Sequence, residues 1–190
     1  MTARWVVERV APARDLTVHW RPISLLFKNN PDPDGKYYAA VARSHRMLRV
    51  MEAVRDGEGD APIQKLYWEF ASRIHHDKIN DFPVAEALAA VGLDTRYAEA
   101  ADDERWDEVV RVAHDDGLSL VGQDVGTPII ALRGADGERI GIFGPVITRV
   151  PSPEQALQLW DGMVACMTVP GFWELKRTRT EAPDLGPRPA

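Results

Sequence analysis

A long block of helical periodicity constrains this chain most strongly. Between Lys36 and Gly117, apolar residues recur every three or four positions, which is typical of amphipathic helices. The first predicted helix carries its stripe on one face: Val41, Ser44, Leu48, Met51 and Val54. The second carries another: Ile63, Leu66, Tyr67, Phe70 and Ile74. A turn at Gly57–Asp60 separates them, and Asp60 is expected to cap the second helix.

Two further helices complete this block. Pro83–Val91 predicts a short helix closed by Gly92, a residue that is common just past a helix end. A last helix ends at Gly117, and its expected core stripe is Trp106, Val109, Val110 and Ala113. The sequence therefore predicts one all-helical region over residues 36–117.

Segments with strand character flank the helical block. Leu16–Leu25 alternates β-branched and aromatic residues with polar ones and predicts a strand, followed by a loop at Asn29–Gly35. Beyond the block, Ile129–Leu132 and Arg139–Phe143 predict two strands joined by a turn at Gly134–Gly137. Strands on both sides of a helical insertion indicate a mixed α/β fold.

Helices are also predicted near both ends of the chain. Met1–Val10 has helical spacing, and Ala11–Arg14 is expected to end that helix. After the hairpin, Ser152–Gln155 forms a capping box with proline in the first turn. The helix that follows is expected to bury Leu157, Trp160, Met163, Val164 and Met167. Phe172–Ala190 is a tail that becomes proline-rich and is expected to end disordered.

Charge and hydropathy exclude several classes of partner. The net charge is −6, from 23 Lys and Arg against 29 Asp and Glu, which disfavours a broad nucleic-acid interface. No apolar run approaches the roughly 20 residues of a membrane span. Charges interrupt the apolar residues of Met1–Val10, so this stretch is unlike a secretory signal. We therefore expect a cytoplasmic protein with neither nucleic acid nor membrane as partner.

Metal binding and hydrolytic chemistry find little support in the sequence. His75 and His76 point about 100° apart on a helix, so no metal site is expected there. Asn30–Gly35 resembles a calcium loop, but Val41 stands where the bidentate glutamate should be. No phosphate loop, dinucleotide fingerprint or Ser-His-Asp arrangement can be placed.

Cysteine use is the central constraint on redox chemistry. Cys166 is the only cysteine, so the 190 residues can form neither an intrachain disulfide nor a Cys-x-x-Cys pair. It lies between Val164 and Met167 in the last predicted helix, where we expect a buried small hydrophobic residue. No catalytic residue is therefore assigned from the sequence.

Several stretches resemble the mycothiol-dependent nitroreductase branch of the DsbA-like family. The similar segments are Gly122–Ile130, Phe143–Val146, Leu159–Asp161, Phe172–Glu181, Ile23–Leu25 with Asn29, and Arg73–His75. The resemblance runs from about Met1 to about Asp184. It implies a thioredoxin-like core at 1–35 and 118–175, a DsbA-type helical insertion at 36–117, and a tail at 176–190.

The resemblance also implies a segment that this sequence lacks. Family members begin with a strand and Cys-Pro-Trp-Cys-Trp, and continue with residues similar to Thr2–Trp5. We therefore expect the first strand and the cysteine-bearing helix start to be missing. Without that strand, the chain is expected to be unstable, to close its sheet differently, or to recruit another chain as a homo-oligomer.

The implied activity is that of an oxidoreductase. The resemblance implies reduction of disulfides or nitro-compounds with mycothiol as a thiol cosubstrate and no tightly bound cofactor. The chain is expected to be inactive in this form because the cysteine pair is absent. The alternative is a cysteine-free thioredoxin-fold binding or assembly protein. A weaker alternative is a helical interaction module built from residues 36–117.

The same resemblance suggests substrate-binding residues. Thr127 and Pro128 match the cis-proline loop, which faces the cysteine pair and whose backbone binds substrate; the alternative is an ordinary turn before a strand. Asn29 matches an active-site asparagine, although it could be a plain loop residue. Tyr37, with Tyr38 as its alternative, falls near the pocket tyrosine of the family, although either could serve only in packing.

Overall fold

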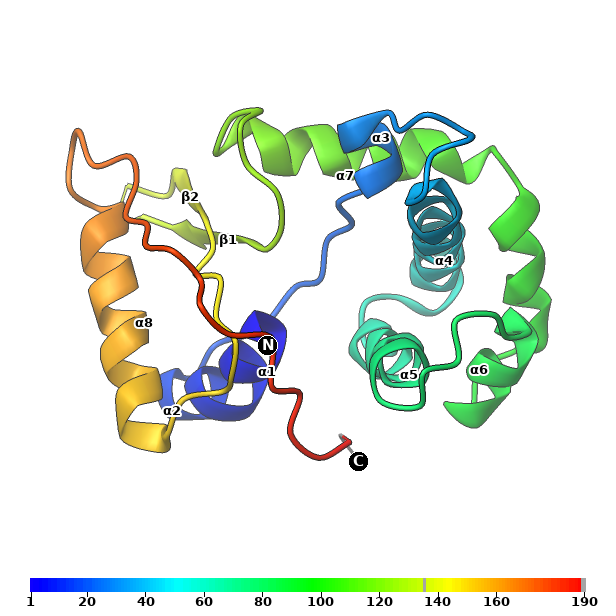
Figure 1. Ribbon diagram of the computed structural model, residues 1–190, viewed down its shortest axis with the longest axis horizontal. Helices are drawn as coiled ribbons and strands as arrows, with labels where there is room; N and C mark the ends of the chain where they lie inside the picture. Colours follow the sequence, from blue (N-terminus) through cyan, green and yellow to red (C-terminus); the bar gives the residue numbers. More distant parts are fainter. Residues whose placement is uncertain (135, 189–190) are drawn as a thin grey trace. The chain divides into compact units, whose positions relative to one another are not determined.

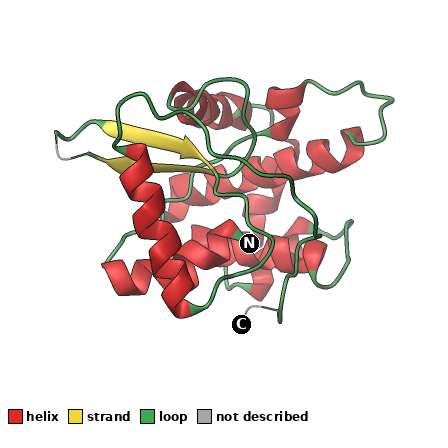
Figure 2. Ribbon diagram, turned by 60° about the vertical axis from the view of Figure 1, so that its left-hand side comes forward, coloured by secondary structure: helices red, strands yellow, loops and turns green. Residues whose placement is uncertain are grey.

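A computed structural model describes residues 1–134 and 136–188. The chain is mixed α/β and mostly helical, with a small sheet of two strands (Figure 2). It divides into two compact units. Unit 1 comprises Met1–Val18 and Gly117–Pro187, and unit 2 comprises His19–Asp116 together with Arg188. None of the described helices is long and apolar enough to cross a membrane.

Residues 19–35 belong to unit 2, although the sequence had assigned them to the thioredoxin-like core. The reason is packing. The Trp20 ring lies 4.4 Å from that of Tyr67, and the Phe27 ring lies 4.6 Å from that of His45. Burying these aromatic rings against helices of unit 2 stabilises the segment there.

The first helical segment is longer than predicted. It runs through α1 (Thr2–Trp5), a π-helical turn (Val6–Val10) and α2 (Ala11–Arg14), coloured blue in Figure 1. The expected break at Ala11–Arg14 was therefore wrong. Pro12 lies directly after the π-helical turn, and the helical backbone continues through it to Arg14. Asp15, with φ of 49°, ends the segment in the left-handed region.

The predicted strand at Leu16–Leu25 is absent from the described structure. The only sheet among the described residues is formed by β1 and β2, and Leu16–Ser24 makes no ladder. Its alternation instead leaves Thr17, His19 and Arg21 exposed on an extended chain. The alternation therefore reflects one side of the segment facing solvent and does not reflect pairing with another strand. Leu25 begins the short helix α3 (Leu25–Asn29).

The hairpin was predicted correctly. Strands β1 (Ile129–Arg133) and β2 (Arg139–Phe143) pair antiparallel, from Ile129 opposite Phe143 to Arg133 opposite Arg139. The predicted turn at Gly134–Gly137 includes Ala135, which lies outside the described residues. Gly141 of β2 lies close to the segment after α7, because a Cβ there would be 2.6 Å from Leu120 Cβ.

The core of unit 1 lies between α8 (Pro153–Met167) and the first helical segment. Ala156, Trp160 and Met163 are buried against Trp5 and Val10. The Trp5 Nε1–H donates to the carbonyl of Ala156 at 3.0 Å. Ser152 is the N-cap as predicted, since its hydroxyl accepts the Gln155 N–H. A buried tryptophan with its N–H satisfied contributes strongly to such a small core.

The C-terminal tail differs from its expected disorder. Its described residues make specific contacts in unit 1: the Thr148 hydroxyl donates to the Glu181 carboxylate, and the Asp184 N–H donates to the carbonyl of Thr148 at 2.7 Å. Glu181 also pairs with Arg149. The disorder prediction for the last two residues, 189–190, lies outside the described chain.

Unit 2 confirms the predicted helical block. Its longer helices are α4 (Tyr38–Glu58), α5 (Ile63–His75) and α7 (Trp106–Ser119), and the shorter ones are α6 (Val84–Ala90) and the 3₁₀ segment η2 (Thr95–Asp102). The side chains at the centre of its core are fully buried: Val50, Val54, Ile63, Leu66, Ala87 and Leu88.

Two details of unit 2 were predicted wrongly. Asp60 does not cap α5, whose N-cap is Pro62, because the Asp60 carboxylate pairs with Arg55 instead. Val109 is exposed on the outer side of α7, whereas Val110 and Ala113 are buried as expected.

Candidate functional site

The predicted substrate residues fall into two pairs. Asn29 and Tyr37 lie in unit 2, and Thr127 and Pro128 lie in unit 1. Asn29 is the last residue of α3 and is exposed rather than part of the predicted loop. Tyr37 is 68% exposed, whereas its neighbour Tyr38 is partly buried and lines a pocket. Of the two tyrosines, Tyr38 is therefore the one that lines this pocket.

The Thr127–Pro128 loop lies close to the start of the first helix. The peptide bond between these residues is cis, as is the Gly144–Pro145 bond. The carbonyl of Pro128 accepts the Gly144 N–H at 2.8 Å. One residue further on, the carbonyl of Pro145 accepts the Thr2 hydroxyl at 2.7 Å. These two hydrogen bonds connect the loop before β1, the loop after β2 and the first turn of α1.

Unit 2 contains a pocket of about 590 Å³. It is formed by α3, the loop that follows, the start of α4 and the outer face of α7. Its lining includes Leu26, Phe27, Asn30, Pro31, Tyr38 and Arg111. The Arg111 guanidinium lies 3.9 Å from the centroid of the Phe27 ring, in a cation–π arrangement. This mixture of aromatic, amide and cationic groups, at this volume, suits a small organic ligand.

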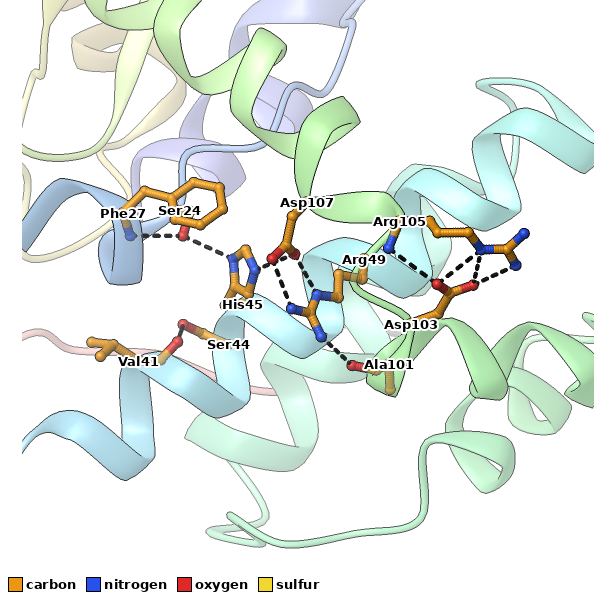
Figure 3. A network of polar contacts seen from close by, with 10 residues as sticks. All are labelled: Ser24, Phe27, Val41, Ser44, His45, Arg49, Ala101, Asp103, Arg105 and Asp107. Atoms are coloured by element: carbon orange, nitrogen blue, oxygen red, sulfur yellow. Dashed lines mark hydrogen bonds and ion pairs between the residues drawn. The ribbon is translucent and has the colours of Figure 1, made fainter. Parts of the chain in front are cut away.

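A buried polar network holds Phe27, one of the residues that line this pocket (Figure 3). The Ser24 hydroxyl accepts the Phe27 N–H at 3.2 Å and donates to His45 Nδ1 at 2.9 Å. His45 Nε2–H in turn donates to Asp107 Oδ1 at 2.8 Å. These two partners assign the His45 tautomer with the proton on Nε2, because the Asp107 carboxylate can only accept a hydrogen bond. The network thus joins α3, α4 and α7.

Arg49 completes the network from α4. Its Nη2 donates to Asp107 Oδ2 at 2.9 Å, and its Nη1 donates to the carbonyl of Ala101 at 3.2 Å. Burial alone would raise the pKa of Asp107, but hydrogen bonds from Arg49 and His45 outweigh it and hold that pKa below its ordinary value. Asp107 is therefore a carboxylate at neutral pH, and it balances the Arg49 charge.

Ser24, His45 and Asp107 together form a Ser-His-Asp constellation that the sequence could not place. They come from three separate elements, so no local spacing relates them. Ser24 is 0% exposed, and its oxygen already accepts a hydrogen bond from the α3 backbone. A nucleophile must reach its substrate, so this serine caps a helix rather than attacking a carbonyl. One feature of the sequence could have indicated part of this network. His45 and Arg49 are four residues apart and therefore lie on the same face of α4.

His114 of α7 contacts the same end of α3. Its Nδ1 accepts the Ser24 N–H at 3.3 Å. Burial lowers the pKa of His114, and the nearby Arg111 and Lys28 lower it further, against an opposing effect of Asp115. The Phe27 ring lies 6.1 Å from that of His114 and 4.6 Å from that of His45. Phe27 is thus held in place by its backbone and by both imidazoles.

Metal-binding groups and thiols are scarce in the described part of the chain. Within the described part of the chain, no group of three His, Cys, Asp or Glu side chains could hold a metal ion. Cys166 is a free thiol on α8 and is only partly buried, so the expectation of full burial was wrong. It lies in the last turn of α8, where the helix packs less tightly than at Trp160.

The small sheet, the helical unit with its pocket and the proline loop beside the first helix together define a mixed α/β protein. A comparison with family models then identifies its relatives. Residues 1–177 match the family described as mycothiol-dependent nitroreductase Rv2466c. Since this match covers most of the chain, the protein belongs to that family.

Proposed function

We propose that this chain has a thioredoxin-like core of the DsbA type and serves mycothiol-dependent reduction of disulfides or nitro-compounds in the cytoplasm. The observation that carries the proposal is the connection of Pro128, Gly144 and Pro145 to Thr2. In thioredoxin-like proteins, a cis-proline loop faces the cysteine pair at the start of this helix. The family match over residues 1–177 supports the same chemistry.

We also propose that the 190 residues lack reductase activity by themselves. Thiol–disulfide exchange needs a thiolate that can attack and a second thiol that resolves the mixed disulfide. The 190 residues contain only Cys166. That thiol lies in the last turn of α8 rather than at a helix N-terminus. We therefore infer that these residues bind the substrates without reducing them.

The third part assigns the substrate pocket. We infer that the pocket of unit 2 takes the nitro-aromatic or disulfide substrate, with Tyr38 and Phe27 as aromatic walls and Asn30 as hydrogen-bonding group. Asn29 and Tyr37 lie beside it, at the end of α3 and the start of α4. Thr127 and Pro128 take the role of backbone contact to the thiol cosubstrate in unit 1.

The experiment compares three proteins: the 190-residue chain, its Cys166→Ser variant, and a fusion in which a strand and a Cys-Pro-Trp-Cys segment precede residue 1. Each is incubated with mycothiol and a nitro-aromatic probe, and loss of the nitro group is followed. Turnover by the fusion alone is expected. Turnover by the 190-residue chain that is lost in Cys166→Ser would contradict the inferred lack of activity.

The second candidate is a binding protein that lacks the catalytic cysteines. It is favoured because the 190 residues contain one cysteine and therefore no cysteine pair. The same experiment separates the two. A fusion that binds the probe but never turns it over supports a binding protein. A fusion that reduces the probe supports the reductase.

A further inference from the structure

Arg111 stands out among the residues that line the pocket. Its guanidinium lies over the Phe27 ring at 3.9 Å from the centroid. Most other arginines near the surface of unit 2 pair with a carboxylate, as Arg46 does with Asp102 and Arg105 with Asp103. Among the described residues, no hydrogen bond or ion pair engages Arg111. A cation is thus presented to the pocket with its donors available.

Contact with the Phe27 ring holds this guanidinium beside the pocket lining. The five N–H donors of an arginine lie in the plane of its guanidinium and point outward from its edges. Planar oxyanions such as carboxylates match two of these donors in a bidentate pair. A flat aromatic acid could therefore lie against Tyr38 and Pro31 and place its carboxylate at Arg111.

The platform under Arg111 is rigidly held. The Phe27 N–H donates to the buried Ser24 hydroxyl, and the ring packs against His45. Holding the ring keeps the guanidinium in one orientation before the ligand arrives, which lowers the entropy that binding must offset.

The charge balance of the pocket favours an anion. Asp32 is the only acidic residue in its lining, and one of its carboxylate oxygens accepts the Asp34 N–H at 3.0 Å within the loop. His114, which contacts the other side of Phe27, has a lowered pKa and adds no charge near pH 7. Arg111 is therefore a charged group of the pocket that forms no ion pair within the described chain.

We propose that Arg111 is a specificity-determining residue that selects aromatic substrates carrying an anionic group, such as a carboxylate, over neutral or cationic aromatics. This inference rests on the proposed function, because it assumes that the pocket takes the aromatic substrate. It adds the chemical class that the pocket prefers and the residue that sets the preference.

The test measures binding of three matched probes to the 190-residue chain by isothermal titration calorimetry: 4-nitrobenzoate, nitrobenzene and 4-nitrobenzylamine. We expect 4-nitrobenzoate to bind about tenfold more tightly than nitrobenzene, a typical charge-assisted difference. Arg111→Gln should remove that preference, and Arg111→Lys should keep part of it. Arg105→Gln, which removes an exposed arginine paired with Asp103, should leave all three affinities unchanged.

The outcomes separate the two proposals. If the probes bind but Arg111→Gln leaves the preference intact, the role of Arg111 is wrong and the pocket assignment survives. Tighter binding of 4-nitrobenzylamine would show that Asp32 dominates and would also overturn the inference. If none of the probes binds, the pocket assignment itself fails, and the inference fails with it. Circular dichroism of each variant establishes that the exposed substitution leaves the fold intact.

Discussion

Asp107 is the residue whose loss should cost unit 2 most among its charged groups. Its carboxylate meets Arg49 and His45, whose side chains are almost fully buried. Asp107→Ala leaves that guanidinium without a carboxylate to balance its charge, which typically costs about 3 kcal/mol or more. The matched control, Asp102→Ala, removes a surface pair with Arg46 and should change stability by at most about 1 kcal/mol. Urea unfolding measures both, and equal losses would contradict the importance of the network.

His114 should give unit 2 a specific pH dependence. Burial lowers its pKa in the folded state below the unfolded value of about 6.5. The unfolded chain therefore binds the proton more readily, so stability is full above about pH 6.5 and decreases as pH falls through that value. Protonation would also remove the acceptor of the Ser24 N–H.

The measurement for His114 is the free energy of urea unfolding at pH 7.5 and at pH 5.5. His114→Gln, which keeps a hydrogen-bonding side chain but does not titrate, should lose less stability between these pH values than the unsubstituted protein. A variant with an unchanged loss would show that other groups cause the dependence.

Sequence reasoning reached only part of the region around the pocket. The resemblance pointed to Asn29 and Tyr37, and their neighbours Asn30 and Tyr38 line the pocket of unit 2. Asn30 ends α3 with φ of 39°, in the left-handed region. Arg111 was not predicted, because its role depends on the Phe27 ring from a distant segment. Sequence patterns record burial along one element and miss contacts between elements.

Two helical glycines make a contrasting pair at the scale of elements. A Cβ at Gly57, near the end of α4, would overlap the hydroxyl of Tyr97, which donates to Glu58 at 3.0 Å. A Cβ at Gly162, within α8, would meet nothing within 4 Å. Gly57→Ala should therefore destabilise the protein by about 1 kcal/mol through overpacking. Gly162→Ala should stabilise it by about 0.5–1 kcal/mol through helix propensity.

Thermal unfolding of the two glycine variants tests this contrast. The midpoint should fall for Gly57→Ala and rise for Gly162→Ala. A stabilising Gly57→Ala would mean that the Tyr97 ring moves aside at no cost. Restoring space with Gly57→Ala combined with Tyr97→Phe should recover part of the loss, because the overlapping hydroxyl is removed.

The helices and the hairpin could be predicted as elements, whereas the strand predicted at Leu16–Leu25 is not formed. The stripe at Ile63, Leu66 and Phe70 and the alternation around the hairpin each match a local period with a buried face. Leu16–Ser24 has the same alternation but makes no ladder in the described structure. A period of two requires only an extended chain, and pairing requires a neighbour that the local sequence cannot specify.

The two units should differ in local stability across the whole molecule. Unit 2 has a core in which α4, α5, α6 and η2 all contribute buried side chains. Unit 1 relies on a smaller cluster around Trp5 and Trp160, and on a sheet of two strands. Ile130, Leu132 and Ile142 of this sheet pack on that cluster but are only partly buried, and a two-stranded sheet by itself is marginally stable. The amides of β1 and β2 should therefore open more readily than those of α4.

Hydrogen–deuterium exchange followed by mass spectrometry tests this order. Opening free energies differ between cooperative units of one protein, and the units with fewer buried contacts exchange first. Peptides from β1 and β2 should take up deuterium earlier than peptides from α4 and α5, with α8 between them because Trp160 and Ala156 are buried. Equal protection of β1 and α4 would show that the hairpin is stabilised as strongly as the helical core. That result would require a partner for the open strand edges, such as a second copy of the chain, and sedimentation of the protein would then show a dimer.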